Sequence, residues 1–344
     1  KQKKYLKAID VYERLKAISD EPDEIDTNIA FEYENLGNYS KAIKHLKKAL
    51  EINPENEGVI FELSFCYEIV NKSEEGVAFF KAFLDKNPYS KIAWFNLGIA
   101  YNNLDLYEKA IESYDFAIAI DDEFSSAYFN KANSYANLQK YNKAISVYKE
   151  VLAREEPEAM TYFYIGECYE KLKEFSMALK YYHKAIETDN SLTEAYVGAA
   201  VAYSEEGQLN KALQHLLSGK KTDPNNTEVL FMLGDVYLKL ENIEDSISSY
   251  KKVSEIDPDN PEIWLEYSRV FYLQEDYDSA INILSEGIRH QPKNADLYYR
   301  MAAYHYRNRK LKEAYFQFEK GLQISLYSHL QAISFDPELG KDSK

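Results

Sequence analysis

No stretch of this sequence stays apolar for the roughly 18 residues that a membrane-spanning helix needs, so we expect no insertion into a membrane. No secretory signal peptide is visible at the start either, but the sequence begins without Met and within a repeat, so this absence is uninformative. Among the 344 residues there are only 2 cysteines, which fits a reducing compartment. We therefore expect the protein in the cytoplasm.

Basic side chains are also in short supply. Lys and Arg number 41 against 57 Asp and Glu, and the formal net charge is −16. Phosphate backbones are bound by clustered Lys and Arg, and an acidic surface repels them. We expect no nucleic-acid partner.

The side chains that perform catalysis or bind metals show no recognisable spacing. The 6 histidines form no His-x-x-x-His or Glu-x-x-His pattern. Cys66 and Cys168 each lack a second cysteine at zinc-finger spacing, and no glycine-rich phosphate loop is present. The sequence therefore predicts no enzyme, no metal site and no cofactor.

What the sequence does contain is a repeat of 34 residues. We number the repeat positions 1 to 34 and place Lys91 at position 1. Position 11 is aromatic throughout: Tyr33, Tyr67, Tyr101, Tyr135, Tyr169, Tyr203, Tyr237, Phe271 and His305. Position 20 is small throughout: Ala42, Gly76, Ala110, Ala144, Ala178, Ala212, Ser246, Ala280 and Ala314.

The spacing within one repeat is helical. Positions 4, 7, 8 and 11 lie three or four residues apart, which places them on one stripe of a first helix. Positions 17, 20, 24 and 27 form the corresponding stripe of a second helix. Small residues at positions 8 and 20 let the two backbones approach closely, and most of the 31 tyrosines fall at core positions. Stacked helix pairs of this kind predict an all-α solenoid.

The third repeat carries a recognisable motif, with Trp94, Leu97, Gly98 and Tyr101 in the first helix. Its second helix supplies Ala110, Tyr114 and Ala117. These residues resemble the tetratricopeptide repeat family. The resemblance implies a right-handed α/α superhelix in which the first helices line a concave face.

The unbroken register predicts nine repeats. Their boundaries are 23–56, 57–90, 91–124, 125–158, 159–192, 193–226, 227–260, 261–294 and 295–328. Residues 1–22 are expected to form the second helix of an incomplete repeat, so we infer a piece of a longer protein. Residues 329–344 are expected to form a C-terminal cap and a polar tail.

First-helix positions 2, 5, 6, 9, 12 and 13 are expected to face the concave side. The candidate peptide-binding residues there are Phe61, Phe95, Asn96, Phe129, Asn130, Asn133, Phe163, Tyr164, Glu167, Phe231, Asp235 and Arg300. Aromatic rings can accept apolar side chains of a ligand, and amides can both donate to and accept from its backbone. The alternative interpretation is that the repeat pattern itself favours an aromatic residue and then Asn at positions 5 and 6.

Three functional hypotheses follow. The first is a scaffold or adaptor that binds a peptide segment of a partner protein in the concave groove. The second is the substrate-recruiting repeat region of a larger enzyme or secretion or envelope complex, whose other domain lies upstream. The third is self-association, with a monomer or weak homodimer formed through the open N-terminal end.

Overall fold

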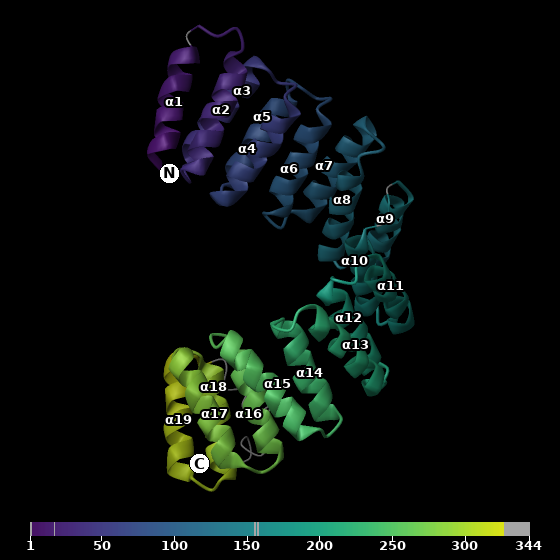
Figure 1. The fold of residues 1–344 in the computed structure, drawn as a ribbon, viewed down its shortest axis with the longest axis vertical. Helices are drawn as coiled ribbons and strands as arrows, with labels where there is room; N and C mark the ends of the chain where they lie inside the picture. The colour runs from purple at the N-terminus through teal and green to yellow at the C-terminus, as the bar shows by residue number, and fades with distance from the viewer. Residues whose placement is uncertain (1, 17, 155, 157, 327–344) are drawn as a thin grey trace. The chain divides into compact units, whose positions relative to one another are not determined.

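The computed structural model describes residues 2–16, 18–154, 156 and 158–326, and within them the chain consists of α-helices without a strand (Figure 1). The predicted all-α solenoid is confirmed. The predicted cap and tail, 329–344, lie outside the described residues. In the part of the chain that is described, no helix is long and apolar enough to cross a membrane.

Helices alternate between the first and the second helix of each predicted repeat. The first helices are α2 (Pro22–Asn35), α4 (Glu57–Ile69), α6 (Lys91–Asn102), α8 (Ser125–Asn137), α10 (Ala159–Lys171), α12 (Thr193–Glu205), α14 (Thr227–Lys239), α16 (Pro261–Leu273) and α18 (Ala295–Arg307). The second helices are α1 (Gln2–Lys16), α3 (Tyr39–Ile52), α5 (Ser73–Leu84), α7 (Tyr107–Ile120), α9 (Tyr141–Arg154), α11 (Phe175–Thr188), α13 (Leu209–Thr222), α15 (Ile243–Ile256), α17 (Tyr277–His290) and α19 (Leu311–Ile324). The repeat boundaries themselves stay a prediction.

The helices group into two compact units. Unit 1 comprises residues 1–172 and contains α1 to α10, and unit 2 comprises residues 173–344 and contains α11 to α19.

The turn between the two helices of a repeat has one geometry. Position 15 has a positive φ in every predicted repeat: Gly37, Asn71, Asp105, Gln139, Lys173, Gly207, Glu241, Glu275 and Arg309. The amide after this residue donates to the carbonyl of position 11, as from Lys72 to Tyr67 at 2.9 Å. A left-handed residue followed by this bond is the Schellman motif, which ends the first helix and reverses the chain.

Position 24 supplies the centre of the core. Tyr114, Tyr148, Tyr182 and Tyr250 are each at most 1% exposed, and Ala110 and Ala144, one turn before Tyr114 and Tyr148 on the same helices, are 0% exposed. The core role predicted for position 24 is thus confirmed, whereas several aromatics at positions 11 and 17, such as Tyr101 and Tyr107, are only half-buried.

Within each unit the first helices lie closer together than the second helices. In unit 1, α4 contacts α6 and α6 contacts α8, and in unit 2, α12 contacts α14 and α16 contacts α18. Across the described ranges, no two second helices make a contact of similar extent. The first helices therefore line the inner side of the curvature of each unit.

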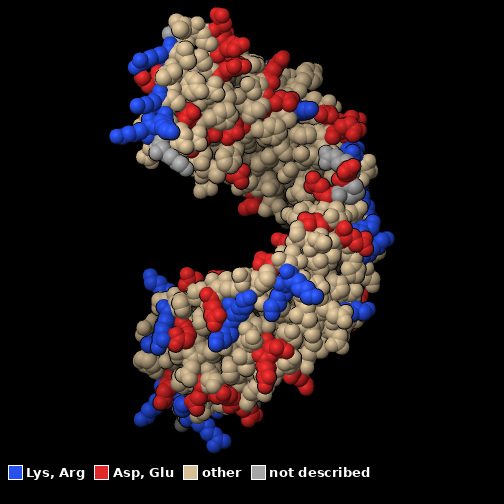
Figure 2. Space-filling view, viewed as in Figure 1, with Lys and Arg blue, Asp and Glu red and all other residues tan. Residues whose placement is uncertain are grey.

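The N-terminal helix α1 closes one end of unit 1. Its Ile9 packs against Ile25 and Ile29 of α2. Beside this contact the fully buried carboxylate of Asp26 accepts hydrogen bonds from His45 Nδ1 at 2.8 Å and from Lys16. Lys and Arg side chains gather over α1 on the face shown in Figure 2, whereas acidic side chains are spread over the rest of unit 1.

Candidate functional site

Helix α4 of unit 1 presents an exposed apolar stripe. Phe61, Phe65 and Ile69 are 41%, 47% and 47% exposed. They occupy positions 5, 9 and 13, and residues four apart lie on the same face of a helix. Phe31 of α2, which has the same repeat position as Phe65, is 42% exposed. We call Phe61, Phe65 and Ile69 the α4 stripe. Adjoining exposed apolar side chains of this size are typical of an interaction surface.

Two of the predicted groove residues, Phe95 and Asn96, instead lie in the core, being 5% and 0% exposed. The ring of Phe95 contacts Phe124, with centroids 5.0 Å apart. Phe124 sits at position 34, where most other repeats carry Asn or Ser, and it covers Phe95. The amide of Asn96 donates to the Ile60 carbonyl at 3.1 Å, so this side chain joins α6 to α4. Neither side chain is available to a ligand.

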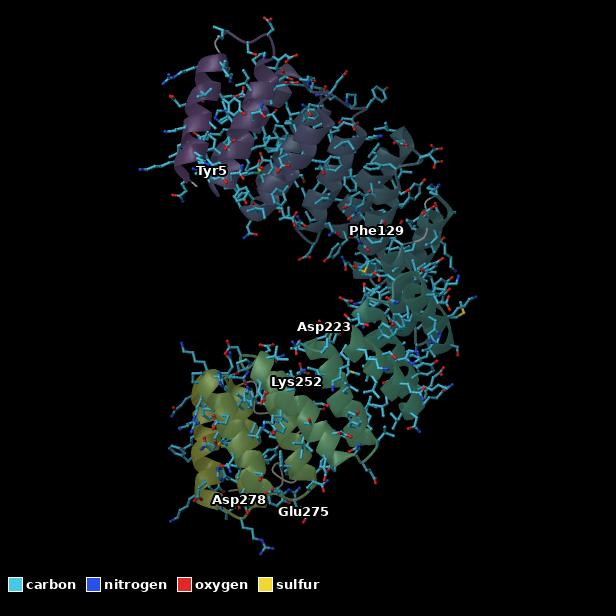
Figure 3. The ribbon with its side chains drawn as sticks, in the orientation of Figure 1. Tyr5, Phe129, Asp223, Lys252, Glu275 and Asp278 are labelled. Carbon is cyan, nitrogen blue, oxygen red and sulfur yellow. The ribbon has the colours of Figure 1, made fainter. Side chains whose placement is uncertain are left out.

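A second aromatic group lies on α8 and α10. Phe129, labelled in Figure 3, is half-buried and its ring lies 5.6 Å from that of Tyr164, which in turn lies 5.5 Å from that of Phe163. Phe129 and Asn130 border a hollow of about 180 Å³. The other lining residues are Ser125, Ser126, Val151, Leu152, Glu156, Glu158 and Thr161. The aromatic row and the hollow together offer a small apolar site with a polar edge.

The amide side chains on α8 are partly used inside the fold. Asn130 Nδ2 donates to the Ser126 carbonyl one turn earlier at 2.9 Å. Asn133 Oδ1 accepts from the Tyr148 hydroxyl and so fixes that core ring. Glu167 on α10 is half-buried. Of the asparagines predicted to hold a ligand backbone, only Asn130 both borders a hollow and keeps a carbonyl oxygen for which the described residues supply no partner.

In unit 2 the remaining predicted residues lie on two helices. Phe231 of α14 packs edge-on against Tyr250 at 5.5 Å, and Asp235 accepts from the Tyr250 hydroxyl at 2.8 Å. Asp235 also borders a hollow of about 520 Å³ together with Arg269. Arg300 of α18 is half-buried beside Tyr304 and hydrogen-bonds to it.

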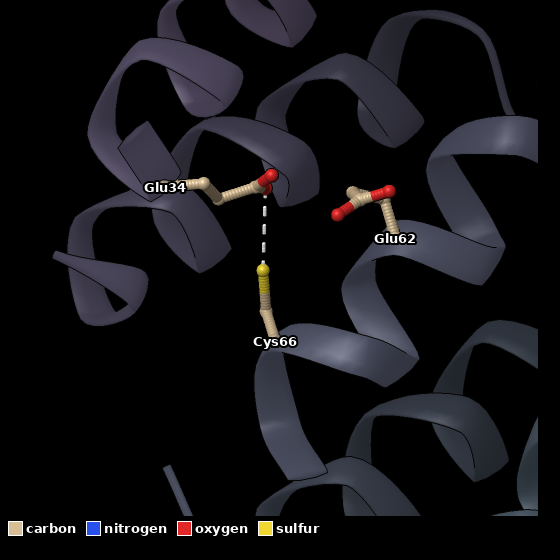
Figure 4. A group of neighbouring side chains, drawn as sticks. All are labelled: Glu34, Glu62 and Cys66. Atoms are coloured by element: carbon tan, nitrogen blue, oxygen red, sulfur yellow. Dashed lines mark hydrogen bonds between the residues drawn. The ribbon is translucent and has the colours of Figure 1, made fainter. Parts of the chain in front are cut away.

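A cluster that the sequence did not reveal joins α2 to α4 (Figure 4). Cys66 Sγ donates to Glu34 Oε1 at 3.3 Å. A carboxylate oxygen of Glu34, a carboxylate oxygen of Glu62 and the sulfur of Cys66 all lie within 4.8 Å of one another. Burial, followed by the hydrogen bond with Glu62, raises the pKa of Glu34 to about 7. Glu34 and Cys66 are 32 residues apart, so no local motif could have shown this cluster.

The chemistry of this cluster favours hydrogen bonds between protonated side chains over the binding of a metal ion. Burial, followed by the charge of Glu34, raises the pKa of the Cys66 thiol far above its ordinary value. The thiolate is the form that binds metals and attacks electrophiles. A thiol held protonated at neutral pH is a hydrogen-bond donor, and Cys66 acts as one here. Both cysteines are free of a disulfide and buried.

Paired antiparallel helices with an aromatic inner face define the class of helical-repeat interaction scaffolds. Tetratricopeptide repeat models match residues 27–56, 92–124, 125–157 and 159–191. The model of the cytochrome c-type biogenesis protein H TPR domain matches residues 221–326. These matches cover more than half of the chain, which belongs to the tetratricopeptide repeat family.

Solved structures show the same fold. Yeast Tom70 is 15% identical, with a TM-score of 0.55 over 97% of this chain and 91% of that chain. The C-terminal part of a TPR repeat-containing protein from Cytophaga hutchinsonii is 20% identical, with a TM-score of 0.55 over 70% of this chain and 98% of that chain. A tetratricopeptide repeat protein from Parabacteroides merdae is 16% identical, with a TM-score of 0.54 over 72% and 98%. No curated protein matches this chain in sequence.

Proposed function

We propose that the protein is a non-enzymatic scaffold that holds an extended peptide segment of a partner protein against the inner face of unit 1. The observation that carries this proposal is the exposed α4 stripe, Phe61, Phe65 and Ile69. Exposed aromatic anchors of this kind supply most of the free energy of binding at protein interfaces.

The rest of the inner face of unit 1 complements the stripe. The row formed by Phe129, Tyr164 and Phe163 offers further rings for apolar side chains of the ligand. The side-chain Oδ1 of Asn130 beside it can accept a hydrogen bond from a ligand amide whatever the ligand sequence. In unit 2, Phe231, Asp235 and Arg300 are proposed to contact a second segment of the partner.

A displayed library of random peptides, selected on the full chain, tests this proposal. We expect enrichment of peptides with aromatic or large aliphatic side chains. The double substitution Phe61→Ser and Phe65→Ser should weaken their binding by at least about tenfold, because it removes two apolar anchors. Since both side chains are nearly half exposed, circular dichroism should remain unchanged.

The matched control is Tyr89→Ser. Tyr89 is 84% exposed and lies between α5 and α6 rather than on the inner face of a first helix. It should leave binding unchanged. If the selected peptides bound the double variant as tightly as the parent, the α4 stripe would not be the binding surface.

A second candidate is a repeat region within a larger assembly machine. The match of residues 221–326 to a domain of a cytochrome c-type biogenesis protein favours it. Fractionation of the intact protein from its own cells decides between the two candidates. Recovery with the cytoplasm agrees with the first, and recovery with an envelope complex agrees with the second.

A further inference from the structure

We propose that His183 and His215, together with Glu187, form a binding site for a divalent transition-metal ion of the zinc type on the second-helix side of unit 2. His183 and Glu187 lie on α11, and His215 lies on α13 of the following repeat. This site is separate from the peptide surface proposed above and is independent of it.

The distance between the two rings suits a shared ion. His183 Nε2 and His215 Nε2 are 3.1 Å apart, and the ring centroids are separated by 5.2 Å. A tetrahedral zinc ion with bonds of about 2.0–2.1 Å places two ligand nitrogens about 3.3–3.4 Å apart. A shift of a few tenths of an ångström would therefore admit the ion.

The hydrogen bond made by the other ring nitrogen of His215, Nδ1, orients this ring for metal binding through Nε2. Its Nδ1 donates to the Lys211 carbonyl one turn earlier, at 2.9 Å. With the proton held on Nδ1, Nε2 carries the lone pair that faces His183. A backbone carbonyl that accepts the other ring N–H is the usual support of a metal-binding histidine.

The tautomers also define what happens when the metal enters. Without an ion, His183 Nε2–H donates to the lone pair of His215 Nε2. With an ion, the proton of His183 moves from Nε2 to Nδ1, so that both Nε2 atoms can bind the ion and this shift itself releases no proton. Burial, followed by the nearby His215, lowers the pKa of His183, which keeps its ring neutral at physiological pH.

Glu187 can supply a third ligand after a change of its side-chain rotamer. It follows His183 by one helical turn and is exposed, and its carboxylate does not lie within 4.8 Å of both ring nitrogens in the structure. A carboxylate is a common zinc ligand. Both residues border a hollow of about 350 Å³ that also includes Gln214 and Ser218. On the other side, the ring of Tyr203 lies 5.0 Å from that of His215 and limits its movement.

The test uses the full chain, freed of metal and titrated with zinc ion against a chromophoric chelator at about pH 7.5. We expect one zinc ion per chain. His183→Asn and His215→Asn should each weaken binding by at least about tenfold, since second-shell changes alone cost that much. Glu187→Gln should weaken binding less than either.

Two controls separate this site from others. His290 stacks on Trp264 at 5.8 Å rather than facing a second histidine, so His290→Asn should bind zinc like the parent. Cys66→Ser should also leave binding unchanged, which excludes the cluster on α2 and α4. The proposal is overturned if no stoichiometric binding occurs, or if binding survives both His183→Asn and His215→Asn.

X-ray absorption on the zinc-loaded parent chain gives a result that does not depend on how the variants fold. Two imidazole ligands support the site. A spectrum with oxygen ligands alone would exclude it.

Discussion

The ring of Tyr250 lies so close to the backbone of Gly234 that an added Cβ would fall 2.6 Å from a ring carbon. Tyr250 is fully buried and also donates to Asp235, so it has no room to move away. We therefore predict that Gly234→Ala lowers the free energy of unfolding by about 1–3 kcal/mol, as overpacking does. Urea denaturation of the full chain measures the change.

Gly58→Ala is the matched control for this substitution. Gly58 also lies in a first helix, but an added Cβ would meet only Asn56 Oδ1, at an ordinary 3.5 Å. Alanine there should be neutral or stabilising by up to about 1 kcal/mol, the difference in helix propensity. Equal effects of the two changes would show that the contact with Tyr250 does not restrict Gly234.

The repeated turn predicts sites where glycine stabilises the chain. Gln139 and Glu241 hold φ values of 57° and 60°, a conformation that strains a side chain but not glycine. Replacing either with glycine relieves this strain, but glycine also loses more conformational entropy on folding than other residues. The net result should be a rise of up to about 1 kcal/mol in the free energy of unfolding. The reverse change, Gly207→Ala at φ 73°, should lower it. A higher midpoint for Gly207→Ala would contradict the argument.

The carboxyl cluster makes stability depend on pH. The pKa of Glu34 is raised from 4.5 to about 7 in the folded chain, chiefly by burial and then by the hydrogen bond with Glu62. The folded state therefore binds more protons than the unfolded state between these values. The free energy of unfolding should fall as the pH rises from about 4.5 through about 7.

Glu34→Gln is the variant that tests this dependence. A neutral amide keeps the size of the side chain but cannot titrate, so the fall in stability over this range should be reduced. Thermal melts at several pH values compare it with the parent. An unchanged pH profile would show that Glu34 titrates normally. Glu75→Gln, which alters an exposed ion pair with Lys72, is the control.

The N-terminal helix offers a test of self-association. Val11 and Leu15 lie one turn apart on α1 and are 53% and 42% exposed. We predict a weak homodimer through this face, which Val11→Lys with Leu15→Lys should abolish. Sedimentation at several concentrations measures it, with Ile52→Lys on another exposed site as the control. Concentration-independent monomers for the parent would remove the hypothesis.

The periodic pattern was sufficient to predict the helix pairs and the buried tyrosines, because both follow from local spacing. It failed at Phe95 and Asn96, because Phe124 at the end of the same repeat covers the first and Ile60 from the previous repeat binds the second. Phe65 occupies position 9, which was expected to face inward, but the ligand contacts predicted at positions 6 and 9 were Asn, Tyr, Glu and Asp side chains, so this exposed ring was not among them.

Contacts across repeats explain the other omissions. His183 and His215 are separated by 32 residues, and whether their rings meet depends on side-chain directions in two different helices. The spacing rules for metal motifs apply within one helix or loop, so they could not detect this pair. The same reason applies to Glu34 and Cys66.

The left-handed residue at position 15 recurs at the same place in each described turn, from Gly37 to Arg309. Because the turn is the same in every repeat, the chain can change its length by whole repeats. A segment of 34 residues can be copied, removed or exchanged as a cassette, since both junctions already have the geometry that the neighbouring cassette requires. Gene duplication can therefore add a module to this protein without inventing a new loop.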